Sequence, residues 1–503
     1  MDYQNTPSEP VKPKKMPQKY LSPIVWIVSI VVFCVFFTFS LAPRVKAQAR
    51  GEQNSTSHYS SIIRTTLDLI QRNYIEEIDT NMLFEGAMSG MLNSLEDPYS
   101  AFLPESEMKD INDTTQGSFG GVGLYVNKPS RTDGRPNFLE VAAPIEDTPG
   151  WRAGINPGDL IIQINDDTTD LLTSDEAVAK LRGQPGTPVN LIIRRGERVE
   201  FPVTLVRAII EVPTVKHDMI GDLGYLKLLT FTPNTVDRSR DAIRDFETKG
   251  YKGIILDLRN NYGGLLNAAV GVSNLFIEGG VVVSTKSRIN SANQIYYARG
   301  RAIVPTEIPV IVLINRASAS ASEIVAGALK DRNRAYLVGE KSFGKGSVQQ
   351  VYPLDKIGFK ITIARYFTPS DVNIDRTGIP PDREVLFPEF SEAEADKFNS
   401  LINSGSIAEF VKSNPEANSA AIESFAQQLH REHGLETVLL KRLIRNEMNR
   451  TTIAPAYDLE YDVQLQEAVK ILRDGNYKTL MQTTKTLKTL QEEAMRDASL
   501  LAS

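Results

Sequence analysis

A run of nineteen residues without a charge constrains the fold of this chain more than any other segment. The run, IVWIVSIVVFCVFFTFSLA, covers residues 24–42 and lies between Pro23 and Pro43. About twenty consecutive apolar residues allow a helix to cross the hydrocarbon core of a bilayer. A helix buried in a soluble core is the alternative, which the continuous length of the run and its lack of any polar face disfavour. The sequence therefore predicts a transmembrane helix over these residues.

The residues around this run indicate its orientation in the membrane and whether it is cleaved off. Before it come four lysines, Lys12, Lys14, Lys15 and Lys19. Because positive residues mark the cytoplasmic side of a span, we expect residues 1–23 to be cytoplasmic and the rest of the chain to be exported. The motif Ala47-Gln-Ala49 would permit cleavage by a signal peptidase. Since Arg44 and Lys46 separate this motif from the apolar run, a retained anchor is the favoured hypothesis.

Composition excludes several classes of function. The only cysteine, Cys34, lies inside the apolar run, so the exported part has no disulfide and no thiol nucleophile. This excludes a cysteine hydrolase and suits an oxidising compartment. The formal net charge of −6 gives no electrostatic reason to bind nucleic acid. At 503 residues the chain is too long for one core, so several domains are expected.

Sequence periodicity divides the rest of the chain into four regions. Residues 55–110 are predicted to be mainly helical. Residues 115–208 combine a glycine-rich loop, SFGGVGLYV, with short alternating strands and one helix, which indicates a compact β-rich domain. Residues 209–388 alternate strands such as GIILDLR with helices such as ASEIVAGALKD, which is typical of an α/β layered core. Residues 389–503 are predicted to be a charged helical region.

Three serines at alternate positions precede one helix of the predicted α/β core, in NRASASASEIVAGALKD. They are Ser318, Ser320 and Ser322, and Glu323 follows them. One interpretation is a capping box, in which Ser320 and Glu323 satisfy free amides at the helix start. The other is a nucleophilic serine at a helix N-terminus, where backbone amides can stabilise an oxyanion. The motif by itself leaves both interpretations open.

A histidine base for such a serine is not expected. The chain has only four histidines, namely His58, His217, His430 and His433. None of them lies between Gly224 and Pro388, so a Ser-His-Asp triad is unsupported. His430 and His433 lack the H-E-x-x-H spacing of zinc peptidases, and no metal site is predicted.

Lys345, in GEKSFGKGSVQQ, is the alternative base. The stretch nearly matches a phosphate-binding loop, but Gly346 stands where Ser or Thr must bind magnesium, and a strand-like segment follows in place of a helix. The nucleotide-binding hypothesis is therefore set aside. To act as a base the amine must be neutral, with a pKa of about 7–8 instead of about 10.4. Burial can cause such a shift, whereas a surface lysine would stay charged.

Together these motifs resemble the carboxyl-terminal processing proteases, the tail-specific serine-lysine peptidases of family S41 with a PDZ domain. In that family the nucleophile is the middle serine of S-A-S-A-S-E, and the base is the lysine of a later F/Y-G-K-G motif. Ser320 and Lys345 occupy these positions at the family spacing. The resemblance implies that Ser320 is the nucleophile, Lys345 the general base and Gln349 the residue that orients the base. Asp331 matches an acidic position with a structural role.

The resemblance also implies where an oxyanion would bind. The donors would be the amide of Ala321 and a turn written D-L-R-x-N-P-G-G, which this chain carries as DLRNNYGG. Tyr262 replaces the proline of the family, while Gly263 and Gly264 are kept, so the turn is expected but the donating amide is left open. EDPYSAFL also resembles a family element. The resemblance covers roughly residues 60–385, and residues 390–452 match nothing in the family.

The β-rich region resembles a PDZ domain, because FGGVGLYV is followed by APIEDTPGWRAGINPGDLIIQINDDT. In that reading Gly121-Val122-Gly123-Leu124 presents backbone amides to the terminal carboxylate of a substrate, and the next strand pairs with the peptide. Arg182, in KLRGQPG, matches a position that helps to switch the active site on in similar enzymes. A surface salt bridge is the alternative role for this arginine.

These features predict a multidomain protein with a transmembrane helix, an inserted PDZ domain, a ClpP/crotonase-like α/β protease core and a helical C-terminal region. We expect a single-pass protein of the bacterial inner membrane whose periplasmic part is a serine endopeptidase without a cofactor. Its substrates would be exported proteins with free, apolar C-termini. The resemblance also implies a homo-oligomer and a helper lipoprotein. The alternative function is a catalytically inactive PDZ scaffold in the cell envelope.

Overall fold

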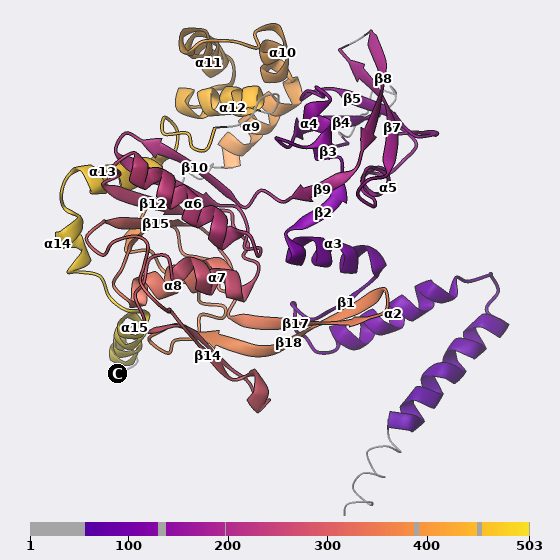
Figure 1. Ribbon diagram of the computed structural model, residues 1–503, viewed down its shortest axis with the longest axis horizontal. Coiled ribbons are helices and arrows are strands. Elements are labelled where there is room, and N and C mark those ends of the chain that lie inside the picture. The colour runs from indigo at the N-terminus through magenta and orange to yellow at the C-terminus, as the bar shows by residue number, and fades with distance from the viewer. Residues whose placement is uncertain (1–55, 129–136, 197, 387–391, 450–454, 502–503) are drawn as a thin grey trace, which may run out of the picture. The chain divides into compact units, whose positions relative to one another are not determined.

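The computed structural model describes residues 56–128, 137–196, 198–386, 392–449 and 455–501 (Figure 1). The chain divides into two compact units, residues 1–91 and residues 92–503. The predicted transmembrane segment, residues 24–42, lies outside the described residues. Within the described ranges, none of the helices combines the length and the apolarity needed to cross a membrane.

The described start of the chain is helical, but less continuously than the sequence predicted. Residues 56–73 form one helix, and α2 (Thr80–Asn93) follows it. Beyond α2, a short strand, β1 (Ala101–Leu103), precedes helix α3 (Glu105–Gln116). Pro98 explains part of this difference, because a proline disfavours the helical conformation of the residue before it.

A six-stranded sheet forms the centre of the second unit (Figure 1). Its order is β10-β11-β12-β15-β16-β19, and β10 is the strand that runs antiparallel to its neighbour. The strands expected from YLKLL, GIILDLR, VIVLIN and AYLVG are all present, which confirms the predicted α/β alternation. The sheet consists of β10 (Val215–Ile220), β11 (Leu223–Leu228), β12 (Gly253–Asp257), β15 (Val310–Ile314), β16 (Tyr336–Gly339) and β19 (Arg383–Glu384).

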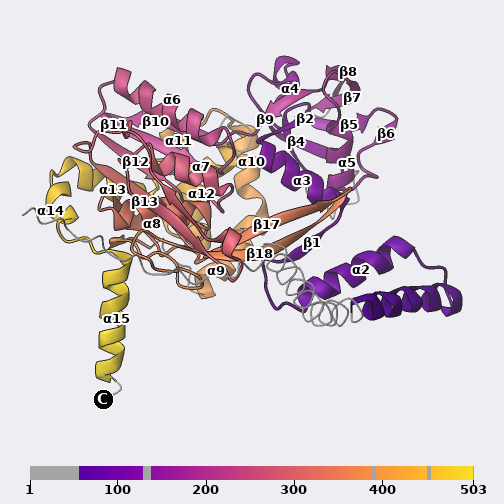
Figure 2. The ribbon, with the colours of Figure 1, turned by 60° about the horizontal axis from the view of Figure 1, so that its bottom comes forward.

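Alternate residues of the inner strands face two separate cores. In β12, Ile254 and Leu256 pack in one apolar cluster, whereas Ile255 packs in another. Because successive side chains of a strand point to opposite faces, a strand that is apolar at every position requires cover on both faces. The first cluster includes α6 (Thr235–Thr248), α7 (Leu266–Ser273) and α8 (Ala321–Asp331), and the second includes α13 (Val463–Arg473) and α14 (Tyr477–Met481) (Figure 2).

A second sheet, with antiparallel pairing throughout, packs on α7 and α8. Its order is β1-β18-β13-β14, and β17 also pairs with β18. Val283 and Tyr366 of this sheet are buried in the same cluster as α7 and α8, so helices lie between two sheets. The added strands are β13 (Val281–Lys286), β14 (Gln294–Tyr297), β17 (Ser347–Leu354) and β18 (Ile357–Phe367).

The β-rich region has its own sheet, with the order β3-β4-β5-β7-β8 and β6 paired to β5. The predicted glycine-rich loop differs from the structure, because its first half is a strand, β2 (Ser118–Gly121), that pairs with β9 (Ala208–Glu211). Helices α4 (Pro149–Arg152) and α5 (Ser174–Leu181) complete the domain. Its sheet consists of β3 (Leu124–Asn127), β4 (Leu139–Pro144), β5 (Leu160–Ile164), β6 (Asp167–Thr168), β7 (Pro188–Arg195) and β8 (Val199–Val206).

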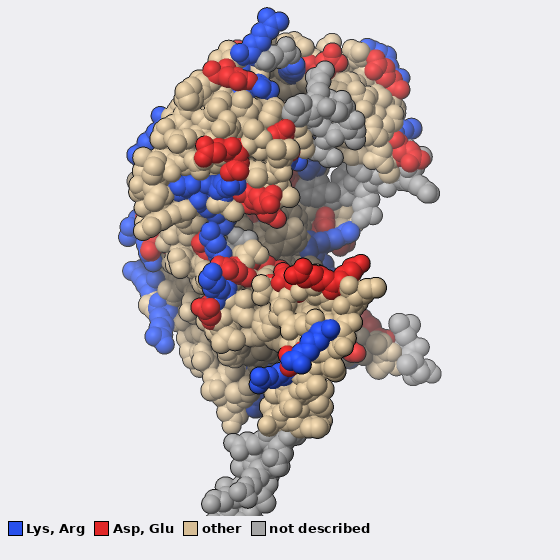
Figure 3. Space-filling view, turned by 90° about the vertical axis from the view of Figure 1, so that its right-hand side faces the viewer, with Lys and Arg blue, Asp and Glu red and all other residues tan. Residues whose placement is uncertain are grey.

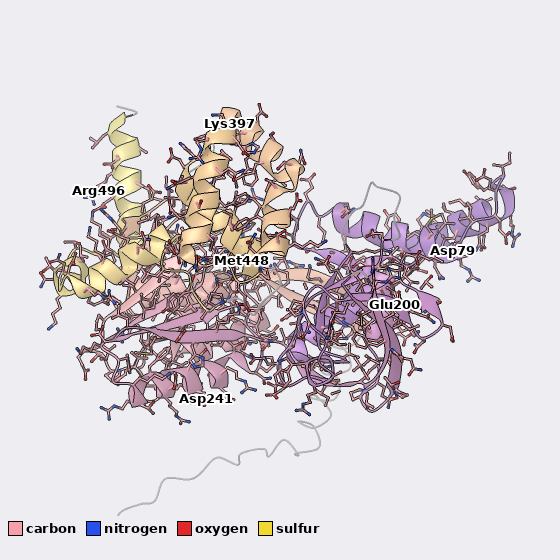
Figure 4. The ribbon with its side chains drawn as sticks, turned by 90° about the horizontal axis from the view of Figure 1, so that it is seen from above. Asp79, Glu200, Asp241, Lys397, Met448 and Arg496 are labelled. Carbon is pink, nitrogen blue, oxygen red and sulfur yellow. The ribbon has the colours of Figure 1, made fainter. Side chains whose placement is uncertain are left out.

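After β19 the chain forms four helices with an apolar core of their own. Leu401, Ile422 and Leu440 are members of that core. In Figure 4, Lys397 on α9 and Met448 on α12 mark this group, and Asp241 on α6 marks the opposite side of the central sheet. The helices are α9 (Glu392–Ser404), α10 (Ser406–Ser413), α11 (Ser419–His433) and α12 (Thr437–Asn449).

Buried charges hold α13 to the central sheet. Arg259, just past β12, donates from Nε and Nη2 to the carboxylate of Asp257 (2.9 and 2.7 Å). It also donates from Nη1 and Nη2 to Asp462, the N-cap residue of α13 (2.7 and 2.6 Å). Arg259 is almost completely buried, and the paired carboxylates offset the cost of removing its charge from water. The turn that follows, residues 260–264, is thereby anchored to the C-terminal part of the chain.

Candidate active site

Three loops meet at the carboxyl ends of β12, β15 and β16. They consist of residues 258–265, 315–320 and 340–346. The amide of Ala319 donates to the carbonyl of Asn261 in the first loop (3.1 Å), and the amide of Phe343 donates to the carbonyl of Ser318 (3.1 Å). Because neighbouring parallel strands end at the same edge of a sheet, residues far apart in the sequence converge there. The candidate serine and lysine come from the second and third loops.

Ser320 has a strained backbone at the start of α8. Its φ is 54° and its ψ is −112°, a region that residues other than glycine rarely adopt. Such strain costs of order 1–3 kcal/mol, and it persists at functional sites where the surroundings enforce it. The amide of Ser320 donates to Glu323 Oε2 (2.9 Å), and its carbonyl accepts from the amide of Ile324 (2.9 Å). Glu323 therefore caps the helix as the sequence suggested, and this capping is compatible with a nucleophilic role for the serine.

Glu323 connects the serine to the lysine loop, a role that its sequence motif did not indicate. Its Oε1 accepts from Ser342 Oγ (2.6 Å) and the amide of Gly344 (2.7 Å). Its Oε2 accepts from the amides of Ser320 and Lys345 (2.9 Å each). The residue is only 1% exposed, and burial raises its pKa while these hydrogen bonds oppose the rise. The spacing in S-A-S-E pointed to the first contact, but the contacts with residues 342–345 required the fold.

One cavity of about 720 Å³ contains the candidate reactive side chains. Ser320, Lys345 and Gln349 all line it. In the part of the chain that the structure describes, no hydrogen bond joins Ser320 Oγ to Lys345 Nζ, although both reach this cavity. Apolar side chains form much of the remaining wall, among them Leu265, Leu266, Ile324, Val348, Ile363 and Ala364.

The amine of Lys345 lies over the ring of Tyr99, with Nζ 4.9 Å from the ring centroid. Burial lowers the pKa of this amine, and the positive charge of Lys360 lowers it as well. The carboxylates of Asp97 and Glu323 act in the opposite direction, but the net shift is downward. This is the direction that a lysine base requires. Tyr99 belongs to the EDPYSAFL segment, and the sequence analysis did not assign it to the site.

Gln349 is oriented differently from the role that the family resemblance implied. Its Nε2 donates to Ser347 Oγ (2.9 Å) and to Thr362 Oγ1 (3.2 Å), so its carboxamide is directed to strands β17 and β18. Lys345 is not among its hydrogen-bond partners in the described residues. Gln349 lines the same cavity as Lys345, but the orienting contact that the resemblance implied is not formed in this conformation.

The turn after β12 packs directly against the candidate nucleophile. A Cβ atom on Gly263 would lie 2.8 Å from the carbonyl oxygen of Ala319 and 2.9 Å from the amide nitrogen of Ala321. The φ of Gly263 is 103°, so this position requires glycine for both space and conformation. Tyr262 does not disrupt the turn, because its side chain is 76% exposed and lines the mouth of the cavity.

The two glycines of this turn have different hydrogen-bond states. The amide of Gly263 already donates to Asn261 Oδ1 (2.9 Å), so it is engaged within the turn. Pairing with Phe231 uses the carbonyl of Gly263 (3.0 Å) and the amide of Leu265 (2.8 Å), which leaves the amide of Gly264 out of the pairing. Gly264 also lines the cavity. Of the two predicted donors, Gly264 is thus the one whose amide can reach a ligand.

The predicted carboxylate-binding residues, Gly121–Leu124, connect β2 to β3. The carbonyl of Gly123 accepts from the amide of Ile145 (2.9 Å) and from the hydroxyl of Thr148 (3.1 Å). A Cβ on Gly123 would lie 2.2 Å from the Thr148 Cβ, and its φ is 74°, so a glycine is needed here. β3 is an edge strand of its sheet, and its described partner is β4. An added strand could therefore pair along its other side.

Arg182 forms an ion pair, as the alternative interpretation of this residue proposed. Its Nη1 donates to Asp113 on α3 (3.0 Å), and its guanidinium lies over the ring of Phe119 at 4.9 Å from the centroid. Both charged side chains are half-buried. Arg182 thus connects the end of α5 to α3 and is not part of the lining of the Ser320 cavity.

Asp331 holds the end of α8 to two other segments. Its Oδ2 accepts from the amide and hydroxyl of Ser370 (3.1 and 2.6 Å). Its Oδ1 accepts from the amide of Leu487, which begins helix α15 (Leu487–Leu501) (2.8 Å). Asp331 therefore joins the end of α8 to Ser370 and to the start of α15, which is a structural role.

The described residues contain no group of three or more His, Cys, Asp or Glu side chains placed to hold a metal ion. Of the histidine pair on α11, His430 is engaged locally, because its Nδ1 lies 2.7 Å from the carbonyl oxygen of Leu435.

Known proteins resemble this chain along most of its length. The peptidase family S41 matches residues 222–385, the PDZ domain matches residues 140–195, and the activating protease CtpB N-terminal domain matches residues 39–106. A carboxy-terminal-processing protease of Bartonella bacilliformis is 40% identical over 362 residues, which are 70% of this chain and 81% of that protein. A carboxyl-terminal-processing protease of Synechocystis is 38% identical over 315 residues, which are 61% of this chain and 72% of that protein. The carboxy-terminal processing protease CtpA of Bacillus subtilis is 34% identical over 333 residues, with 65% and 70% covered.

The substitution Glu323→Gln should lower the free energy of unfolding by about 1–3 kcal/mol. Each carboxylate oxygen of Glu323 accepts from two donors, whereas a glutamine offers one acceptor oxygen and turns an NH₂ group toward the other pair. Urea titration of the purified protein measures the loss. Glu247→Gln, on the exposed face of α6, should stay within about 0.5 kcal/mol of the wild type. Equal stability of Glu323→Gln and the wild type would contradict the central position given to this carboxylate.

Proposed function

Because the chain belongs to the carboxy-terminal-processing proteases of peptidase family S41 and is a serine-type peptidase, we propose that Ser320 and Lys345 are its catalytic dyad. In this proposal the enzyme binds the C-termini of exported proteins through its PDZ domain and hydrolyses their peptide bonds. The observation that carries the proposal is the shared cavity, in which a strained serine and a lysine of lowered pKa are held by one buried glutamate.

The proposed reaction begins with proton transfer. Neutral Lys345 takes the proton of Ser320 Oγ, and the oxygen attacks the carbonyl carbon of the scissile bond. The lysine then gives the proton to the departing amine, and water hydrolyses the acyl-enzyme in the same way. Since Lys345 Nζ lies over Tyr99 in this conformation, the amine must first turn toward Ser320. We propose that Gln349 then orients it by releasing Thr362.

The proposed oxyanion hole consists of the amides of Ala321 and Gly264. Ala321 is the first residue of α8, where the amides of a helix have no partner within the helix. Gly264 lines the cavity, and the pairing of its turn leaves its amide out. Gly263 has a supporting role in this proposal, because its amide is engaged by Asn261. Donors that are fixed before the reaction stabilise the developing negative charge without reorganising.

Substrate selection is assigned to the PDZ domain. The amides of Gly121–Leu124 would bind the terminal carboxylate, and the free edge of β3 would pair with the last residues of the substrate. Leu124 and Val126 of β3 pack with the apolar core that includes α5, which suits apolar last residues. Arg182 would affect activity through its link to α3 and not through contact with the dyad.

The cellular location and the domain limits of this chain are also proposals. We propose a single-pass protein of the bacterial inner membrane with residues 24–42 as anchor, because that run is uncharged and follows four lysines. The domain limits, with the PDZ domain at 115–208 and the core at 209–388, are proposed from the periodicity of the sequence. Figure 3 shows acidic and basic side chains interspersed on one face, which offers no continuous basic surface for nucleic acid there.

A homo-oligomer is proposed as well. Large apolar side chains on the N-terminal helices are exposed in the single chain, among them Tyr59, Ile62, Leu69 and Met82. A helper lipoprotein is proposed as a partner on the family resemblance alone. Light scattering of the purified full chain tests the oligomer, and a monomer mass would contradict it.

The substitution Lys345→Arg should lower kcat by about 10²–10⁴-fold and as much as Lys345→Ala, because a guanidinium does not release its proton at accessible pH. Ser320→Ala should abolish cleavage. The measurement is hydrolysis of an unfolded protein across neutral to alkaline pH. Lys341→Arg, an exposed lysine in the same loop, is the matched control and should keep the activity. An active Lys345→Arg enzyme would refute the assigned base, and intact substrate with the wild-type enzyme would favour the inactive scaffold.

Amidation of the C-terminus of a substrate should raise KM by about tenfold or more and leave kcat at saturation unchanged. The amide removes the charge that the loop amides recognise, and hydrogen bonds to a charged group contribute about 1.5–3 kcal/mol. Steady-state kinetics on a matched pair of peptides, free acid and amide, give both constants. The proposal for the PDZ domain fails if the two peptides have the same KM.

The full chain should stay with the membrane after extraction with alkaline carbonate. A form that lacks residues 1–46 should be recovered in the soluble fraction, because it has lost the uncharged run. Immunoblotting of the two fractions is the measurement. Recovery of the full chain in the soluble fraction would contradict a retained anchor.

A further inference from the structure

The ring of Tyr99 lies beside the amine of the proposed base. The Nζ atom of Lys345 lies 4.9 Å from the centroid of the Tyr99 ring, within the range of a cation–π interaction. The ring belongs to the segment that leads into β1, far from the lysine in sequence. In the proton transfer proposed above, Nζ must leave this ring, and the ring itself takes no part in the transfer.

The segment that carries Tyr99 is fixed to the second sheet. Asp97 accepts from the amide of Tyr99 (3.1 Å) and from the hydroxyl of Ser100 (2.5 Å). The hydroxyl of Ser100 in turn accepts from the amide of Thr362 on β18 (3.0 Å). Residues of β1 then pair with β18, with Ala101 opposite Lys360. The segment of Tyr99 is therefore fixed to β18, the strand that also carries Thr362, to which the side chain of Gln349 donates.

The ring distinguishes between the two charge states of the lysine. An ammonium is attracted by the negative face of an aromatic ring, whereas a neutral amine is attracted far less. Burial raises the pKa of Tyr99, and the carboxylates of Asp375, Glu323 and Asp97 raise it further against Arg376, so the ring stays neutral. The charged groups that affect Lys345 itself are Lys360, Asp97 and Glu323.

We propose that the Tyr99 ring is a holding site for the protonated Lys345 side chain, and that Tyr99 is a positioning residue for the base. This proposal rests on the proposed role of Lys345. The ammonium lies on the ring, and loss of its proton releases the amine toward Ser320 in the same cavity. Tyr99 thereby sets the pH above which the base becomes available, without touching substrate.

The test is the pH dependence of kcat/KM, which reports the ionisation of the free enzyme. The substitution Tyr99→Leu removes the ring but keeps an apolar neighbour, so it should move the acidic limb of the profile to lower pH by about 0.4–1.5 units. Tyr99→Phe keeps the aromatic face and should restore the wild-type limb. Tyr74→Leu, an exposed tyrosine elsewhere, is the matched control and should not move the limb.

A second replacement keeps the test decisive if Tyr99→Leu does not fold. Tyr99→3,4,5-trifluorophenylalanine has nearly the same shape but a weaker negative face, so it should also move the limb to lower pH. An unchanged limb in the folded variants, or a limb at higher pH, would overturn the holding site. Lys345→Ala in the same background separates the two proposals. An active Lys345→Ala enzyme refutes the dyad, whereas an inactive Lys345→Ala enzyme together with an unchanged limb in Tyr99→Leu refutes only the role of Tyr99.

Discussion

The site depends on one buried carboxylate that accepts hydrogen bonds from two different loops. Glu323 binds the amide of Ser320 on one side and the amides of Gly344 and Lys345 on the other. A buried acceptor that is fully used is costly to disturb, because each displaced donor loses its partner away from water. The strained conformation of Ser320 and the position of the lysine loop are therefore not independent features. They are set together by a residue that takes no proton and contacts no substrate in the proposed reaction.

The backbone of the core could be predicted from the sequence, because continuous apolar strands alternating with helices permit few layered arrangements. Comparison with relatives of known family then supports a protease core with a PDZ domain. The finer features of the site could not be predicted. Whether Gln349 contacts Lys345 or Thr362, and whether Gly263 or Gly264 keeps a usable amide, depends on side chains that meet only after folding. The contact of Tyr99 with Lys345 joins residues that no local pattern connects.

Recognition and chemistry occupy separate parts of the chain in the proposed function. The free edge of β3 belongs to one sheet, whereas the cavity of Ser320 is built from the core and the second sheet. Backbone pairing along an edge strand is tolerant of side chains, so such a domain can accept many tails. Partial burial of Lys345 lowers the pKa of its amine and so favours the neutral form. In the proposed enzyme, recognition thus tolerates many side chains, whereas catalysis requires one buried amine with a lowered pKa.

The pairing of Arg259 with Asp462 bears on how the chain matures. These residues are 203 positions apart in sequence, and the guanidinium that adjoins the turn 260–264 obtains its second carboxylate only from the start of α13. During synthesis from the N-terminus, that partner emerges near the end. Until it does, the buried guanidinium beside the glycine turn lacks the hydrogen bonds that Asp462 accepts, which weakens its native packing. In a chain without α13, the turn 260–264 would thus be held less firmly, so the finished geometry of the site depends on the C-terminal part of the chain.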